Sequence, residues 1–291
     1  MPKPKIIVIL GPTATGKSDL AVKIALQLRS GSSTKKKGGE IISADSRQVY
    51  KGLDIGTGKI TKKEMRGIPH YLIDVANPKH KFTVAEYKIL TEEKIKEIIS
   101  RGKTPIICGG TGLYIDAITK GTIFPEVPPN MKLRKILEKK SVKELFKILL
   151  KLDPRRAKDI KEKNELNNKV RLIRAIEIAK HLGNVPKIIE KNPKYKFIKI
   201  GLYLPPDKSK EKIEKRVKQM FKNGLLKEIK KLKKSGISEK RLKEFGFEYN
   251  DPTIEKVIKE TIKYTKRQMT WFKRDKEIKW FDASKKVILG L

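Results

Sequence analysis

Short apolar runs alternate with longer amphipathic stretches through the first part of the chain. Four runs have the length and composition of buried strands: residues 5–10 (KIIVIL), 40–45 (EIISAD), 70–75 (HYLIDV) and 104–110 (TPIICGG). Helical patterns cover residues 17–28 and 83–100 between them. The expected apolar face of the second helix carries Ala85, Ile89, Ile95 and Ile98. Strands that alternate with helices predict a parallel sheet with crossover helices, and therefore an α/β fold.

The pattern changes between residues 121 and 195, where helical periods are rich in basic residues and broken by prolines, with no convincing strand. A strand returns at residues 196–204, and a short one is expected at residues 278–282. One helix is expected after the first of these, with an apolar side of Ile213, Val217, Phe221, Ile229 and Leu232. Asp251 and Pro252 are expected to cap a last long helix. We predict a core of residues 1–120 and 196–291, interrupted by an all-helical insertion at residues 121–195.

The turn after the first strand has the spacing of a phosphate-binding loop, G-x4-G-K-[ST], between a strand and a helix. In such a P-loop, backbone N–H groups surround a phosphate chain, the lysine neutralises it and the last hydroxyl binds Mg²⁺. Lys17 and Ser18 stand at those two positions, so Mg²⁺ is the expected cofactor. The residues predicted to bind phosphate groups are Gly11, Pro12, Thr13, Ala14, Thr15, Gly16, Lys17 and Ser18.

Composition adds an expected partner. The 291 residues include 70 Lys and Arg against 33 Asp and Glu, a formal net charge of +37, which favours a polyanion such as nucleic acid. A lysine-rich solvated surface would give the same excess. One cysteine and three histidines exclude a disulfide framework and a metal-ligand cluster by spacing. No apolar run is long enough for a membrane span, and the first strand starts too early for a targeting peptide, so a cytoplasmic protein is expected. Residues 29–39 (RSGSSTKKKGG) are expected to form a flexible surface loop.

Asp45 closes the second strand, beside the P-loop, at the edge where open parallel sheets bind ligands. Its carboxylate could bind magnesium through water, cap a helix or accept a proton from a nucleophile. Asp74 closes the next apolar run and competes for the magnesium role. The residues leave these alternatives open.

Thr111 lies among glycines in CGGTG, where the backbone can approach a ligand closely. It could bind a phosphate oxygen or serve as an ordinary helix N-cap. Arg171 and Arg174 share a helix face that suits phosphate contacts or plain solvent. Arg216 is unremarkable by position, and Cys108 is expected to be a buried filler. These residues alone leave three classes open: a small-molecule kinase, an RNA-dependent NTPase, and a transferase that uses another pyrophosphate.

Seven stretches, in the same order, resemble the tRNA dimethylallyltransferase (IPP transferase) family over nearly the whole chain. They are GPTATGKS, EIISADSRQVYKGLDIGTGK, IPHYLIDVANP, PIICGGTGLY, NNKVRLIRAIEI, RVKQMFKNGLLKEI and KRQMTWFKRD. The chain departs from the family pattern at GFE (residues 246–248), where a GYK-like turn is expected.

The resemblance implies an enzyme that moves the dimethylallyl group of dimethylallyl diphosphate to N6 of adenosine 37, beside the anticodon of tRNA. It implies that Asp45 is the general base that takes the N6 proton. Thr111 and Arg216 would stabilise the leaving diphosphate, together with Lys17 and a Mg²⁺ ion on Ser18.

The resemblance also implies that the target base flips out of its stack and that the insertion grips the anticodon stem. A monomer is the default expectation, and no membrane partner is expected. The implied tRNA contacts are Asp45, Ser46, Arg47, Gln48, Thr111, Arg134, Arg171, Arg174, Arg267 and Gln268.

Overall fold

The computed structural model describes residues 3–30, 38–187, 189–190 and 194–285. Most of the loop expected at residues 29–39 lies outside these ranges. The chain divides into two compact units, one of Met1–Gly121 with Asn192–Leu291 and one of Thr122–Lys191. We describe each unit by itself.

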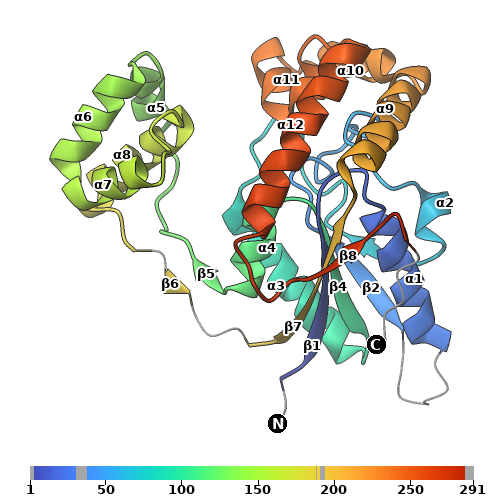
Figure 1. Cartoon of the computed structure of the whole chain (residues 1–291). Coiled ribbons are helices and arrows are strands. Elements are labelled where there is room, and N and C mark those ends of the chain that lie inside the picture. The colour runs from blue at the N-terminus through green and yellow to red at the C-terminus, as the bar shows by residue number, and fades with distance from the viewer. Residues whose placement is uncertain (1–2, 31–37, 188, 191–193, 286–291) are drawn as a thin grey trace. The chain divides into compact units, whose positions relative to one another are not determined.

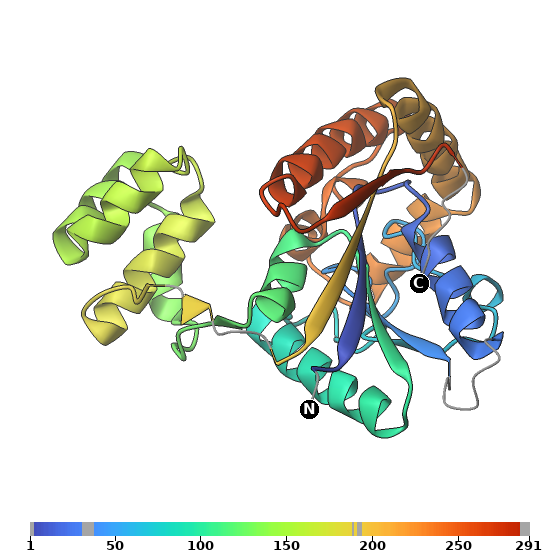
Figure 2. The same ribbon diagram turned by 60° about the horizontal axis from the view of Figure 1, so that its bottom comes forward.

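A six-stranded sheet is the centre of the first unit (Figures 1 and 2). Its strand order is β3-β2-β4-β1-β7-β8, and every neighbouring pair is parallel, as the sequence predicted. The strands are β1 (Lys5–Leu10), β2 (Gly39–Ser43), β3 (His70–Tyr71), β4 (Thr104–Gly109), β7 (Lys196–Tyr203) and β8 (Lys279–Asp282). Because β2, β4 and β1 are neighbours, the loops that follow them meet at one edge.

Both faces of the sheet are buried, which explains why its strands are continuously apolar. Ile6 and Val8 of β1 face α3 (Val84–Ser100) and α4 (Gly112–Thr119). Ile7 and Ile9 face α1 (Lys17–Ser30) on the other side. Alternate residues of one strand thus serve two separate cores.

Two local predictions were wrong. The third strand ends after Tyr71 rather than at residue 75, because Leu72 and Asp74 have positive φ angles (60° and 57°) that turn the chain out of the sheet. In α3, Ile89 is 57% exposed and Ala85 is also exposed. The buried positions of that helix are Tyr87, Thr91, Ile95 and Ile98.

Helices of the C-terminal part cover the end of the sheet at which the strands finish (Figure 1). They are α9 (Pro206–Lys222), α10 (Leu225–Lys234), α11 (Glu239–Phe245), the 3-10 turn η1 (Phe247–Tyr249) and α12 (Ile254–Phe272). The single helix expected after residue 205 is two helices, because Gly224 adopts a φ of 99° between them. Thr253, not Asp251, caps α12 by accepting a hydrogen bond from the N–H of Lys256. A short α2 (Lys62–Met65) has a capping box at Thr61 and Glu64.

The second unit contains α5 (Met131–Glu138), α6 (Val142–Leu152), α7 (Pro154–Glu162) and α8 (Lys169–Leu182). Leu145, Leu149 and Leu172 are fully buried in their shared core. The unit is not purely helical, since β5 (Thr122–Ile123) pairs antiparallel with β6 (Ile189–Glu190). Two-residue strands carry too little pattern to be read from the sequence.

Candidate active site

Loops that follow β1, β2 and β4 border a cavity of about 790 Å³, which α9 and α12 close from the opposite side. This volume lies within the range of small-molecule sites. The cavity wall brings together most residues that the motifs marked, although they come from five separate segments. Those used below are Lys17, Ser18, Asp45, Gln48, Arg216 and Gln268.

The P-loop has the conformation that its sequence requires. Ala14 and Gly16 have φ angles of 64° and 81°, and the Thr15 hydroxyl donates to the carbonyl of Pro12 at 2.9 Å. The ammonium group of Lys17 also donates to the Pro12 carbonyl. Burial lowers the pKa of Lys17 to about 8, and the neighbouring Arg216 cation acts in the same direction. The lysine is held inside the loop in a place that is ready for an anion.

Gln268 of α12 links the P-loop to the loop after β4. Its Oε1 accepts from the N–H of Thr13 at 3.0 Å, and its Nε2 donates to the carbonyl of Gly110 at 2.8 Å. A Cβ atom at Gly110 would lie 2.4 Å from that Nε2, so the glycine is needed for this contact. Gln268 is 7% exposed. Its role in this structure is to hold two loops together.

Asp45 lies two residues beyond β2 and lines the cavity. Its Oδ1 accepts from the N–H groups of Arg47 (2.8 Å) and Gln48 (3.2 Å), which fixes the carboxylate in a turn. One oxygen is therefore held by the backbone in the manner of a cap. This arrangement is compatible with a second role for the other oxygen.

Thr111 is at the N-cap position of α4 but makes no capping hydrogen bond. Its Oγ1 instead accepts from the N–H of Ser46 at 3.0 Å and lies 3.3 Å from the Ser46 hydroxyl. The side chain therefore joins the GGTG loop to the loop that carries Asp45.

Arg216 reaches the cavity from α9, where sequence position alone gave it little weight. Its Nη2 donates to the carbonyl of Thr57 at 3.2 Å. Burial lowers the pKa of Arg216, and Arg47 adds to this effect while Asp45 opposes it. Arg216 thus lines the same cavity as Lys17 and the carboxylate of Asp45.

Comparison with known proteins shows which family the chain belongs to. A family model described as IPP transferase matches residues 48–275. The chain is 39% identical to the tRNA dimethylallyltransferase of Halothermothrix orenii, over 96% of this chain and 88% of that protein. It is 41% identical to the one of Caldanaerobacter subterraneus subsp. tengcongensis, over 95% and 91%.

The chain belongs to the IPP transferase family. The resemblance stated from the sequence is confirmed, and the chain is a prenyltransferase by family. Its structure is similar to the tRNA isopentenylpyrophosphate transferase of Bacillus halodurans, with a TM-score of 0.66, 37% identity and coverage of 97% of this chain and 90% of that one. It is also similar to a eukaryotic dimethylallyltransferase acting on tRNA, with a TM-score of 0.75, 27% identity and coverage of 96% and 74%.

In this IPP transferase, Arg47 is engaged within the protein. Its Nη1 lies 2.5 Å from Oε2 of Glu248, whose side chain is 6% exposed. Its guanidinium also lies over the rings of Phe247 (5.8 Å) and Tyr264 (5.4 Å). The GFE departure from the family pattern thus supplies the carboxylate that partners Arg47.

Asp74, the competitor for magnesium, pairs with Nζ of Lys59 at 2.5 Å. Lys59 also binds Asp54 at 2.7 Å and the carbonyl of Tyr50 at 2.9 Å. Asp74 is not among the residues that line the described cavity, whereas Asp45 is. Cys108 is buried, and burial raises the pKa of its thiol to about 11, so the filler role expected of it fits.

Arginines of the second unit have internal partners as well. Arg134 makes a two-pronged contact with Glu177, with Nε and Nη2 at 2.9 and 2.7 Å from its two oxygens. Arg174 binds the same carboxylate and the carbonyl of Val127. Arg171 pairs with Glu165. Arg267, on α12 of the first unit, is exposed and lies over the ring of Tyr264.

Sequence reasoning missed three acidic residues that accept hydrogen bonds inside the protein: Glu177 and Glu248 from arginines, and Glu228 from the N–H groups of residues 54–56. Glu177 and Glu228 both lie inside motifs quoted for the family, NNKVRLIRAIEI and RVKQMFKNGLLKEI, but a glutamate on a helix is usually a surface residue. Glu248 was marked only as part of a departure. All three could have been noticed in the sequence as acidic residues next to an apolar residue in a strongly basic chain.

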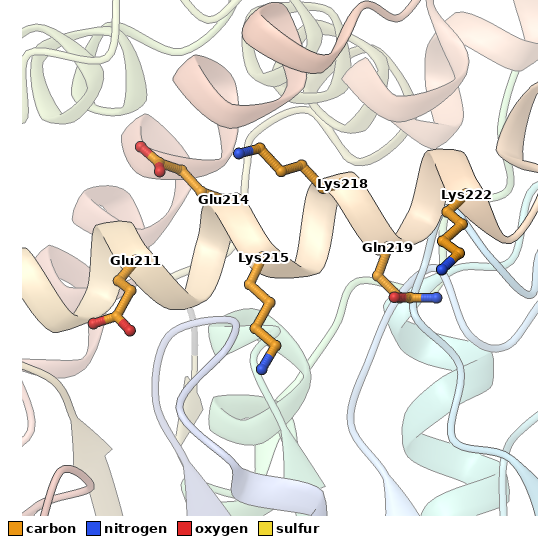
Figure 3. A pocket seen from close by; sticks show the side chains of 6 residues that line it. All are labelled: Glu211, Glu214, Lys215, Lys218, Gln219 and Lys222. Carbon is orange, nitrogen blue, oxygen red and sulfur yellow. The ribbon is translucent and has the colours of Figure 1, made fainter.

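A second, shallow hollow of about 390 Å³ runs along α9 (Figure 3). Its wall carries two glutamates followed by three lysines and Gln219, and Glu214 pairs with Lys210 while Glu211 pairs with Lys208. Such i,i+3 and i,i+4 pairs are typical of a solvated helix face. Gln219 lines both this hollow and the large cavity, so the two adjoin.

Among the helices of the described residues, none is long and apolar enough to cross a membrane.

Proposed function

We propose that the chain transfers the dimethylallyl group of dimethylallyl diphosphate to N6 of adenosine 37 in tRNA and releases diphosphate. The observation that carries this proposal is the convergence of the P-loop, Asp45 and Arg216 on one cavity of about 790 Å³. A cavity of this size holds a base and a short prenyl diphosphate together. Family membership supplies the reaction class, and the names of the relatives supply the RNA substrate.

In the proposed reaction, N6 forms a bond to C1 of the dimethylallyl group while the bond from C1 to the diphosphate oxygen breaks. Asp45 accepts the proton that N6 loses, through the oxygen that the turn leaves available. Lys17 and Arg216 neutralise the diphosphate as it leaves, and Thr111 donates a hydrogen bond to its bridging oxygen. Because these donors are fixed before substrate binds, little reorganisation is needed during reaction.

Mg²⁺ is the expected cofactor, and the donor set suits it. Within the described residues no cluster of three or more His, Cys, Asp or Glu side chains could hold a metal. The hydroxyl of Ser18 offers a hard oxygen on the cavity wall. Mg²⁺ binds readily through one or two protein oxygens, substrate phosphates and water. Bound there, it would lower the charge of the diphosphate.

The RNA side of the proposal follows the same geometry. Adenosine 37 leaves its stack to enter the cavity, and Ser46 and Gln48 contact it and its neighbours. Helices of the second unit grip the anticodon stem through Arg171, and Arg267 adds a contact from α12. Arg47, Arg134, Arg174 and Gln268 are proposed to contact the tRNA as well, and each of them, like Arg171, also has a partner within the protein. We propose a cytoplasmic monomer.

The test uses an unmodified tRNA with adenosines at positions 36 and 37, Mg²⁺ and dimethylallyl diphosphate, followed by mass analysis of the nucleosides. We expect a five-carbon gain at adenosine 37 that is absent when ATP replaces the diphosphate. RNA-dependent ATP hydrolysis without that gain would contradict the proposal.

Replacing Asp45 with Asn separates catalysis from folding in the same assay. The amide keeps one oxygen for the turn but cannot take the N6 proton, so kcat should fall by roughly 100-fold or more. The affinity for tRNA, measured by filter binding, should change little. Wild-type turnover in this variant would exclude Asp45 as the base.

A further inference from the structure

Glu228 lies on α10, within the RVKQMFKNGLLKEI motif but with no role assigned from the sequence, and its carboxylate binds the loop of residues 54–58. Its Oε2 accepts from the N–H groups of Asp54 (2.9 Å) and Ile55 (2.7 Å), and its Oε1 accepts from that of Gly56 (3.1 Å). Three consecutive N–H groups aimed at one anion form a nest. The hydroxyl of Tyr249 donates to the same Oε1 at 2.9 Å. Both oxygens therefore carry two hydrogen bonds, which fills the capacity of the carboxylate.

Packing leaves this loop little freedom once Glu228 is in place. A Cβ atom at Gly56 would lie 2.6 Å from the Tyr249 ring, so the backbone rests directly on that side chain. Tyr249 is 2% exposed and α10 is anchored by Leu225, which is fully buried. The loop is thus fixed from the helical side of the cavity.

The far end of the loop sets the position of Arg216. Its Nη2 donates to the carbonyl of Thr57, the neighbour of the nest. Gly58 has a φ of 57°, and a Cβ atom there would lie 2.1 Å from the same Nη2. Gln48 Nε2 donates to the carbonyl of Gly58 at 3.3 Å. A displacement of the loop would therefore move the guanidinium on one side and the Asp45 turn on the other.

We propose that Glu228 is a positioning residue for the reaction, which acts through the 54–58 loop to hold Arg216 where diphosphate binds. The proposal deepens the proposed function and rests on it for the identity of the anion. Glu228 does not line the cavity and touches no reacting group. Its effect on catalysis is indirect, through a loop that would otherwise have three unsatisfied N–H groups.

The decisive measurement compares Glu228→Gln with the wild type. The glutamine side chain has nearly the same volume and keeps one acceptor oxygen. Its NH₂ group replaces the other oxygen and faces N–H groups of the loop, so it cannot accept their hydrogen bonds. We expect kcat/KM for dimethylallyl diphosphate to fall by about 100-fold, as a displacement near 1 Å would cause. The affinity for inorganic pyrophosphate, measured by calorimetry, should fall about tenfold, while the Kd for tRNA should stay within about twofold.

A double-mutant cycle distinguishes positioning from general destabilisation. In an Arg216→Ala background, Glu228→Gln should weaken pyrophosphate binding no further, because the group on which it acts is gone. Additive losses would overturn the proposal, as would wild-type pyrophosphate affinity in Glu228→Gln. The matched control is Glu214→Gln on α9, whose carboxylate has a lysine 4.0 Å away on the helix surface and should leave every measurement unchanged (Figure 3).

Tyr249→Phe provides a milder variant if Glu228→Gln does not fold. It removes one donor from Glu228 Oε1 and should produce a several-fold loss in the same direction. Unchanged pyrophosphate binding in that variant, with the other not folding, would count against the proposal. A wild-type chain that binds pyrophosphate but transfers no prenyl group would refute the proposed function alone, because the pyrophosphate cycle still tests Glu228.

Discussion

Lys17 carries its charge in a setting that disfavours it until an anion arrives. Burial and Arg216 lower the pKa of its ammonium group to about 8, from 10.5. In the folded chain the proton is therefore lost earlier than in the unfolded chain, so this group makes the fold more stable as pH rises from about 8 toward 10.5. Binding of a diphosphate has the opposite requirement, since it needs the protonated form.

From this conflict we predict a pH effect on substrate capture. The value of kcat/KM for dimethylallyl diphosphate should fall above about pH 8, because that ratio reports groups of the free enzyme. A Lys17→Arg variant that retains activity should lose this decline, since arginine stays protonated. Steady-state kinetics from pH 7 to 10 would check it. A wild-type profile flat through pH 9 would contradict the assignment.

Arg47, which the resemblance implied as an RNA contact, forms an ion pair with Glu248. Replacing either member alone leaves a buried charge without its partner, so each of Arg47→Met and Glu248→Met should reduce the free energy of unfolding by roughly 3 kcal/mol. The double variant should recover most of this loss, because apolar residues of similar size can replace a buried pair. Urea unfolding of all four proteins measures the coupling. Independent losses in the two single variants would instead favour separate roles.

At this scale the sequence identified chemical groups better than it identified their partners. The P-loop and Asp45 were marked because a local pattern defines them, and the structure brings them to one cavity. Whether they act as proposed stays a prediction. Gln48 and Gln268 were marked through resemblance and Thr111 through the glycines around it, and their contacts at long sequence distance could not be read from any pattern.

Among the helices, α8 shows how one buried glutamate organises a basic element. Glu177 is 2% exposed and gathers Arg134 and Arg174 against α5 and the chain near Val127. Burial acts to raise the pKa of Glu177, but hydrogen bonds from both arginines and from the N–H of Asn130 lower it on balance. The stabilisation is therefore complete above the ordinary pKa of 4.5 and is lost as pH falls through the lowered value.

Replacing Glu177 with Gln should accordingly destabilise the second unit by roughly 3–5 kcal/mol, the cost of breaking a buried ion pair. Hydrogen exchange of α8 amides in the whole chain would measure it. The exposed Glu162→Gln on α7 is the matched control and should change stability by less than about 0.5 kcal/mol. Equal exchange in the two variants would mean that the cluster is not what holds α8.

Element boundaries were predicted well where burial is two-sided and poorly where it is not. The runs that became β1, β4 and β7 are apolar on both faces, so their ends are sharp. In α3 the buried face follows Tyr87, Thr91, Ile95 and Ile98, because a threonine and a tyrosine were packed inward while Ile89 was left outside. Periodicity alone could not rank these residues. The break at Gly224 needed a positive φ that the sequence only permits.

For the whole molecule, the α/β core and its parallel sheet could be predicted because strand, P-loop and helix follow one another in a strict local order. The strand order β3-β2-β4-β1-β7-β8 could not, because it depends on contacts between residues far apart in the chain. The net charge of +37 indicated a polyanion but not which face it meets. Several arginines that the resemblance implied as RNA contacts also pair with carboxylates of the chain, and whether they contact RNA stays a prediction.

The short β5–β6 ladder has an evolutionary consequence. Thr122 pairs with Glu190 and Ile123 with Ile189, so the chain enters and leaves the second unit at adjacent points. A segment with neighbouring ends and its own core can be gained, exchanged or lost as one piece of a gene, while the strand order of the first unit stays the same. Two short strands are therefore enough to make the second unit a transferable cassette, whose helices can diversify while the chemistry of the core is inherited unchanged.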